Sequence, residues 1–174
     1  MIFTTKAEYG VRLLVELGRQ TATDPPRPTS LKAIAEAEGL PLAYLERIVA
    51  LLRRAGLVDS TRGAHGGYRL ARPAEEISMD EAILALEGTI APMNCFVDDV
   101  EGGPAGSKVL CSHERADGER CATKLLWTRV QGGVMERLAG TTLAELVAFA
   151  EGPVATGGLT IDPLPTSLQE TAHA

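Results

Sequence analysis

The sequence predicts a mainly α-helical chain with one β-hairpin, and two observations indicate this class. Apolar residues recur at helical spacing through most of residues 5–56 and again from residue 122 onward. Between these stretches, residues 62–67 (RGAHGG) separate two short strand-like pieces, and glycines supply the positive φ angles that a tight hairpin turn needs. We therefore expect a winged helix-turn-helix with a β-hairpin wing, followed by a long C-terminal dimerisation helix.

The first expected helix spans residues 5–20. Thr5 and Glu8 have the spacing of a capping box, in which side chains at a helix start bind its exposed backbone N–H groups. Apolar residues then follow one stripe over the next turns. This helix therefore has one face to pack against the elements that come after it.

Two short helices are expected next. Thr29 or Ser30 is a suitable N-cap for the first of them, and Gly39 ends it. Pro41 suits the first turn of the second, whose apolar residues repeat at helical spacing until Gly56. Short helices joined by so brief a turn are typical of a helix-turn-helix motif.

Beyond the hairpin, Ser78 and Glu81 form a second capping-box pair, which predicts a helix that ends at Gly88. Residues 89–120 then lose any apolar period and gather glycine, proline and aspartate. We expect a long loop here, and long loops inside compact proteins are commonly functional.

A long helix is expected from Ala122 to Leu138. Its apolar face is too wide for a helix alone in water, so we expect a second copy of the chain to cover it. Gly132 and Gly133 interrupt this helix, which permits a bend or a close helix crossing. The expected divisions of the chain are a DNA-binding domain (1–75), a connecting helix (76–93), a cysteine-bearing sensor loop (94–121), the dimerisation helix with a short terminal helix (122–151) and a flexible tail (152–174).

The net charge of −6 averages two unlike parts of the chain. Residues 1–73 hold 11 Lys and Arg against 7 Asp and Glu, a net charge of +4, whereas residues 74–174 hold 6 against 16, a net charge of −10. Phosphate binding needs local positive charge, so this asymmetry is typical of a DNA-facing half joined to a half without DNA contacts. The N-terminus lacks an apolar run, so we expect a cytoplasmic protein with no membrane segment.

Six stretches of the chain resemble one known family. The most specific is RGAHGGYRL at residues 62–70; the others are TTKAEYG (4–10), LAYLE (42–46), LRRAGLV (52–58), ISMDE (77–81) and TLAEL (142–146). Taken in chain order, these stretches are similar to the Rrf2 family of winged-helix transcriptional regulators, which includes the iron-sulfur regulators IscR and NsrR. The resemblance implies a homodimer packed through its long helices, three cysteines that hold an iron-sulfur cluster, and control of genes for cluster assembly, nitrosative or oxidative stress, or iron and sulfur supply.

Two features depart from the pattern of this family. IscR-like members space their cysteines closely, whereas fifteen residues separate Cys95 from Cys111 and nine separate Cys111 from Cys121. Lys124 stands where IscR supplies a histidine ligand, and a protonated lysine cannot ligate iron.

Residues 41–54 would be the recognition helix. Tyr44, Glu46 and Arg47 lie in its N-terminal half, where side chains meet base edges in the major groove. A less specific interpretation has Tyr44 packing on the wing. The expected contacts with a palindromic double-stranded operator are Ser30, Lys32, Tyr44, Glu46, Arg47, Arg62, His65 and Tyr68, with Arg62 entering the minor groove.

Three cysteines, Cys95, Cys111 and Cys121, fall within 27 residues. A disulfide framework is not expected in a reducing cytoplasm, so their clustering indicates metal, cluster or thiol chemistry. Thiolates are natural ligands of [2Fe-2S] and [4Fe-4S] clusters, and three of them leave one coordination position to fill. The candidates for this position are Glu8 of the partner subunit, which the resemblance favours, His113, Asp98 and Asp99.

Two alternatives keep DNA binding but change the sensor. The cysteines form a zinc site with His113, or they act as a thiol-disulfide switch. An enzyme is not expected, because His65 lies in the expected wing, His173 lies in the tail, and no cysteine sits in a nucleophile-like motif.

Overall fold

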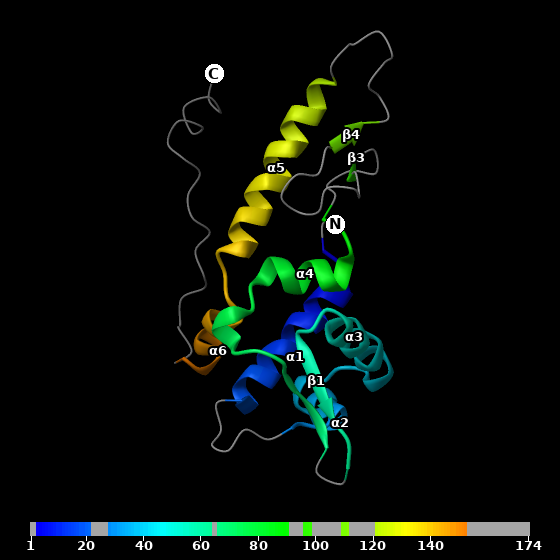
Figure 1. The fold of residues 1–174 in the computed structure, drawn as a ribbon, viewed down its shortest axis with the longest axis vertical. Helices are drawn as coiled ribbons and strands as arrows, with labels where there is room; N and C mark the ends of the chain where they lie inside the picture. The colour runs from blue at the N-terminus through cyan, green and yellow to red at the C-terminus, as the bar shows by residue number, and fades with distance from the viewer. Residues whose placement is uncertain are drawn as a thin grey trace.

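The computed structural model describes residues 3–21, 28–63, 66–90, 96–98, 109–111 and 121–152, with backbone alone for 96–98 and 109–111. It confirms the mainly α-helical class with a β-hairpin (Figure 1). The elements in chain order are α1 (Thr5–Thr21), α2 (Leu31–Glu38), α3 (Leu42–Arg54), β1 (Val58–Thr61), β2 (Gly67–Leu70), the 3-10 turn η1 (Ala74–Glu76), α4 (Met79–Glu87), β3 (Phe96–Asp98), β4 (Val109–Cys111), α5 (Ala122–Ala139) and α6 (Leu143–Glu151).

Helix α1 is the centre of the fold. It contacts α2, α3, β2, α4 and α6, and Figure 1 shows it crossing between the helix-turn-helix and α4. Leu13, Leu14 and Leu17 are fully buried, as the predicted apolar stripe requires. Because α1 packs against both the helix-turn-helix and the C-terminal helices α4 and α6, its position fixes the helix-turn-helix relative to those helices.

The helix-turn-helix follows the expected local signals. The Ser30 hydroxyl caps α2 by accepting a hydrogen bond from the Ala33 backbone N–H at 3.1 Å. Gly39 ends α2 with a φ of 64°, in the left-handed region that glycine adopts without strain. Pro41 is the N-cap residue of α3, one position before the helical place that the sequence favours for it.

The wing is the antiparallel hairpin of β1 and β2, with Val58 opposite Leu70 and Thr61 opposite Gly67. Its second strand also joins the segment before α2, because the backbones of Thr29 and Tyr68 exchange two hydrogen bonds of 2.9 and 2.8 Å. The wing is therefore tied to the start of the helix-turn-helix as well as to its end.

Gly67 is required by this attachment. A Cβ atom at Gly67 would lie 2.6 Å from the backbone carbonyl of Thr29, closer than real Cβ atoms come. Gly67→Ala is expected to lower the free energy of unfolding by about 2 kcal/mol, since it must push the wing away and lose hydrogen bonds. Urea unfolding followed by circular dichroism measures the change. Gly152→Ala is the control, because its added Cβ meets only ordinary contacts at 3.4 Å or more; an equal effect of both substitutions would contradict the expectation.

The first expected capping box is wrong. Helix α1 begins at Thr5, and the carbonyl of Thr4 accepts the first helical bonds, from the N–H groups of Ala7 and Glu8. The backbone N–H and hydroxyl of Thr4 both donate to the Glu87 carboxylate, at 3.1 and 2.5 Å. The Thr4 hydroxyl also accepts a hydrogen bond of 3.2 Å from the Lys6 backbone N–H, so Thr4 caps the helix. Glu87, at the end of α4, takes the role that the capping box gives to Glu8, and Glu8 is left exposed.

The second expected capping box is also wrong. Ser78 is the N-cap residue of α4, but its hydroxyl donates to Asp80. Glu81 instead accepts a hydrogen bond of 2.6 Å from Arg72, and this bond raises the pKa of the Arg72 guanidinium above its ordinary value. Both carboxylates near the helix start thus have partners other than the backbone.

The expected long loop contains a second small hairpin. Strands β3 and β4 pair antiparallel, and the register places Phe96 opposite Cys111. Three-residue strands are too short to give a recognisable alternation of apolar residues, which is why the sequence does not reveal them. The predicted flexibility of residues 153–174 lies outside the described residues.

Candidate nucleic-acid interface

The exposed side of α3 carries three arginines, one glutamate and two alanines. Its opposite side is buried through Leu45, Ile48, Val49 and Leu52. The exposed stripe contains Ala43, Glu46, Arg47, Ala50, Arg53 and Arg54, which share one helix face because they are spaced three or four residues apart. The two alanines are small enough for close approach to DNA, and Arg47 and Arg54 stand about 10 Å apart along the axis. Because the arginines outnumber Glu46, this face can place positive charge against a DNA groove.

The three expected readers on α3 fall into two classes. Glu46 and Arg47 are exposed, as a reader of base edges must be. Tyr44 is half-buried, and its ring stands edge-on against Tyr9 of α1, with centroids 5.6 Å apart and an angle of 88°. Tyr44 therefore packs on α1, and the interpretation that it packs on the wing is not what the structure shows.

The start of α2 offers two exposed polar side chains. The Ser30 oxygen accepts the capping bond, which leaves its O–H available to donate. Lys32 lies 3.8 Å from Glu36, with both side chains more than two-thirds exposed, at 76% and 69%. Such an exposed ion pair is weak and does not prevent Lys32 from reaching a phosphate.

On the wing, Arg62 is exposed beside Gly63, whose φ of 117° turns the chain. Tyr68 is half-buried at the attachment to Thr29 described above. Arg69 was not among the expected contacts, yet it is exposed and lies 3.7 Å from Asp59 on the neighbouring strand. The remaining expected contact, His65, lies outside the described residues.

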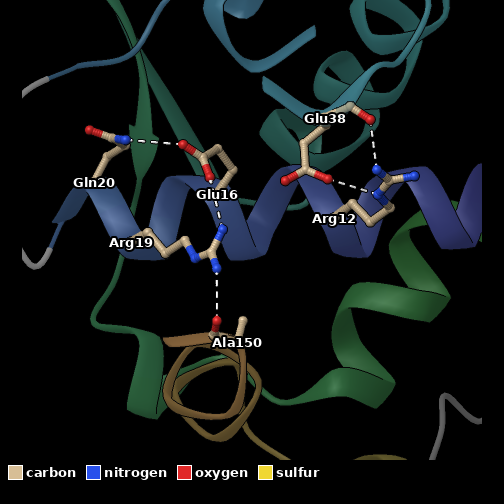
Figure 2. Close-up of polar contacts among 6 residues, drawn as sticks. All are labelled: Arg12, Glu16, Arg19, Gln20, Glu38 and Ala150. Atoms are coloured by element: carbon tan, nitrogen blue, oxygen red, sulfur yellow. Dashed lines mark hydrogen bonds and ion pairs between the residues drawn. The ribbon is translucent and has the colours of Figure 1, made fainter. Parts of the chain in front are cut away.

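Sequence reasoning also missed two arginines that position the helix-turn-helix. Arg12 of α1 donates to the carboxylate and to the backbone carbonyl of Glu38, at 2.8 and 2.6 Å, and so holds the end of α2 (Figure 2). About two turns further on, Arg19 pairs with the buried Glu16 at 3.6 Å and donates to the Ala150 carbonyl of α6 at 2.9 Å. Glu38 and Ala150 lie 26 and 131 residues away from their arginines in sequence, so no local pattern reveals these two contacts.

The cysteine-bearing segment is described in part. Cys121 is the N-cap residue of α5, half-buried, with its Sγ 3.1 Å from the Thr123 hydroxyl. Cys111 and Asp98 are described by their backbone only, and Cys95, Asp99 and His113 lie outside the described residues. Among the side chains that the structure does describe, no three His, Cys, Asp or Glu groups lie close enough together to hold a metal ion.

Glu8 lies far from Cys121 within one chain. It lines a groove of about 480 Å³ between α1, α4 and the end of α5, together with Phe3, Val11, Ile83 and Leu138. Leu138 belongs to the last turn of α5, whereas Cys121 precedes its first turn. Seventeen residues of helix separate the two, about 25 Å along the axis. Glu8 and Cys121 of the same chain therefore cannot ligate one metal.

Helix α5 leaves most of its surface uncovered by the described parts of the chain. None of its residues is buried, and Leu125 and Leu126 are 60% and 54% exposed. Only its last turns pack on α1 and α4, through Val134, Met135 and Leu138. Figure 1 shows the first half of α5 extending away from α4 and the helix-turn-helix. No described helix has the length and apolar character that crossing a membrane requires.

Comparison with known proteins identifies close relatives of this arrangement. A model of the Rrf2 family, described as iron-dependent transcriptional regulators, matches residues 3–149. The transcriptional regulator CymR of Bacillus subtilis is 36% identical over 152 residues, which cover 87% of this chain and 94% of CymR. The solved structure of that protein, described as the global cysteine regulator, has a TM-score of 0.64 over 84% of this chain and 96% of its own.

Two further solved structures are similar at comparable identity. IscR of T. potens is 34% identical, with a TM-score of 0.65 over 89% of this chain and 92% of its own. The oxidized form of Staphylococcus aureus CymR is 35% identical, with a TM-score of 0.62 over 89% of this chain and 100% of its own. These relatives confirm the winged-helix regulator fold, and they are regulators rather than enzymes, as the sequence predicts.

Proposed function

Because this chain belongs to the Rrf2 family of DNA-binding transcriptional regulators, we propose that it is a cytoplasmic homodimer that binds a palindromic operator and senses iron-sulfur, redox or nitrosative status. In this proposal Cys95, Cys111 and Cys121 hold an iron-sulfur cluster. The observation that carries it is the β3–β4 register, in which Cys111 lies opposite Phe96, the chain neighbour of Cys95. The pairing thus brings β4, which ends at Cys111, beside the strand that directly follows Cys95 in the sequence, and Cys121 precedes the helix proposed to dimerise.

The exposed stripe of α3 and the wing supply the DNA contacts. Arg47 and Glu46 read base edges, Arg62 enters the minor groove, and Ser30 and Lys32 bind phosphate. The charge of +4 over residues 1–73 supports this assignment, because it lies in the half of the chain that carries both elements. A dimer presents two such surfaces, which is why the operator is expected to be palindromic.

The dimer is formed by antiparallel packing of the two α5 helices. An added Cβ at Gly132 or Gly133 would meet no atom within 4 Å, so this part of α5 is open to close approach by a second helix. A crossing there brings Leu126 of each chain to the last turn of the other α5, beside the groove that Leu138 lines. The exposed leucines of each copy are then covered by the other.

The same arrangement provides a fourth ligand. Glu8 cannot reach Cys121 of its own chain, but an antiparallel α5 pair brings the start of one α5 near the Glu8 groove of the other chain. We therefore assign the fourth position to Glu8 of the partner subunit. When bound, the cluster supplies a centre that is readily oxidised or lost, and an oxygen ligand makes it more labile than a fourth thiolate does. The cysteines couple that change to the start of α5, and so to the dimer.

A second candidate keeps the DNA-binding half and replaces the cluster by thiol chemistry. Two of the similar structures favour it, because B. subtilis CymR is described as a global cysteine regulator and S. aureus CymR is known in an oxidized form. The wide spacing of the three cysteines is compatible with a reversible disulfide. Zinc held by the cysteines and His113 is the remaining alternative.

One set of measurements on anaerobically purified full-length protein decides among these sensors. Iron and acid-labile sulfide with visible absorbance are expected for the cluster. Zinc without iron would indicate the zinc site instead of the cluster. Reversible loss of two thiols without bound metal would indicate the thiol-disulfide switch. Electrophoretic shift of selected palindromic duplexes tests DNA binding; the affinity is expected to fall steeply with salt, as phosphate neutralisation requires. Absence of any shift at low salt would overturn the regulatory assignment.

A further inference from the structure

A cleft of about 550 Å³ separates the start of α1 from the start of α3. Ala43 and Arg47 line it, and both also belong to the exposed stripe of α3. The cleft therefore opens directly beside the surface proposed to enter the major groove. The described residues that line it are Thr5, Tyr9, Pro41, Ala43, Tyr44 and Arg47.

Each of the polar side chains that line this cleft can donate a hydrogen bond. Thr5 and the two tyrosines bring hydroxyls, Arg47 brings a guanidinium, and no carboxylate is among the described lining residues. Within the described parts of the chain, no hydrogen bond or ion pair engages these four side chains. The permanent positive charge of Arg47 beside three hydroxyls suits an anionic ligand with several acceptor oxygens.

The ring contact of Tyr9 and Tyr44 makes this arrangement rigid. The two rings stand edge-on at 5.6 Å, and both are half-buried, so their hydroxyls are held by packing between α1 and α3. Hydroxyls fixed in advance lose little conformational entropy when they bind a ligand. The rings also place Tyr44 on the α1 side of α3, away from the centre of the exposed stripe, where base edges would be read.

We propose that this cleft binds a phosphate group of the DNA backbone at the edge of the major groove. The proposal rests on the proposed DNA-binding function and adds Thr5 and Tyr9 to the interface. It also reassigns Tyr44 from reading bases to positioning the recognition helix. A helix in the major groove lies between two phosphate strands, and a cleft on its flank faces one of them. Phosphate contacts set register and orientation, whereas base contacts set sequence preference.

The test uses the full-length dimer and two fluorescent duplexes, a selected operator and a mixed-sequence duplex of equal length. Tyr9→Phe and Tyr44→Phe remove single hydroxyls and keep the ring packing. Each is expected to weaken binding of both duplexes by a similar factor, about tenfold for each hydrogen bond to a charged group and so about 100-fold for a dimer that loses one in each half-site. Thr5→Val is expected to act in the same direction. Thr141→Val, which removes a hydroxyl bound to the Arg137 carbonyl at the end of α5, is the matched control and should leave both affinities unchanged.

A neutral phosphate provides the second measurement. Methylphosphonate is substituted at one backbone position after another in the operator, and one position per half-site is expected to weaken wild-type binding but not further weaken Tyr9→Phe binding. Loss confined to the operator duplex would overturn the proposal, since that is the behaviour of a base contact. Unchanged affinity in both tyrosine variants would overturn it as well. If the wild-type chain bound neither duplex, the DNA-binding function would fail, and the cleft with it.

Discussion

The double variant Leu125→Glu, Leu126→Glu is expected to be monomeric and to bind its operator at least about 100-fold more weakly than the wild type. Both leucines are more than half exposed on a helix without a buried residue, so the substitutions leave the described core of the subunit intact. In the proposed dimer they place four carboxylates in an apolar interface, which opposes association. A monomer engages one half-site and loses the gain in effective concentration that a linked second site provides.

Sedimentation velocity and fluorescence anisotropy measure the two effects separately. Phe149→Glu is the matched control, because Phe149 is 63% exposed but lies on α6, outside the proposed α5 interface. That control should stay dimeric and bind normally. A double variant that remains dimeric at micromolar concentration would show that α5 is not the interface. A monomer with unchanged operator affinity would refute the proposal that a dimer binds two half-sites at once.

Replacing Cys121 by alanine is expected to abolish the visible absorbance of anaerobically purified protein and to remove its iron and sulfide. Cys121 begins α5, and a cluster with three cysteine ligands has no spare thiolate to replace it. Thr123→Ala is the control, since it removes the hydroxyl 3.1 Å from the Cys121 sulfur but leaves the thiol itself. The control should keep its colour. Equal iron in Cys121→Ala and wild type would exclude this cysteine as a ligand.

Local signals made the helix-turn-helix predictable. Ser30, Gly39 and Gly56 each act within a few residues of their own position, and the structure shows the cap and the left-handed conformations that these residue types favour. In the wing, Gly63 has the positive φ that the sequence predicts, at 117°. Gly66 and Gly67 do not adopt a positive φ, and Gly67 is required instead because a Cβ there would clash with Thr29. At Ser30 and at the glycines with a positive φ the residue type was sufficient, whereas the local signal of Ser78 and Glu81 was misleading because Asp80 and Arg72 bind these side chains instead.

Predictions failed where the partner comes from a distant part of the chain. The helix start at Thr4 is satisfied by Glu87, 83 residues away, so the capping-box spacing of Thr5 and Glu8 was misleading. Tyr44 shows the same limit at the candidate site, because its contact with Tyr9 depends on how α1 packs against α3. Recognising the cleft between these helices requires that packing, although Arg47, which lines it, was already an expected DNA contact.

Arg12 and Arg19 lock α1 to the end of α2 and the end of α6, and this has a consequence for signalling. In the proposed dimer, α1 joins the helix-turn-helix of each subunit to its C-terminal elements, so we expect a change at the cysteines to move each helix-turn-helix as one unit. Such a movement would alter the distance between the two α3 helices. DNA half-sites are spaced by about one helical turn, 34 Å, so a small change in that distance would put one recognition helix out of phase with its groove.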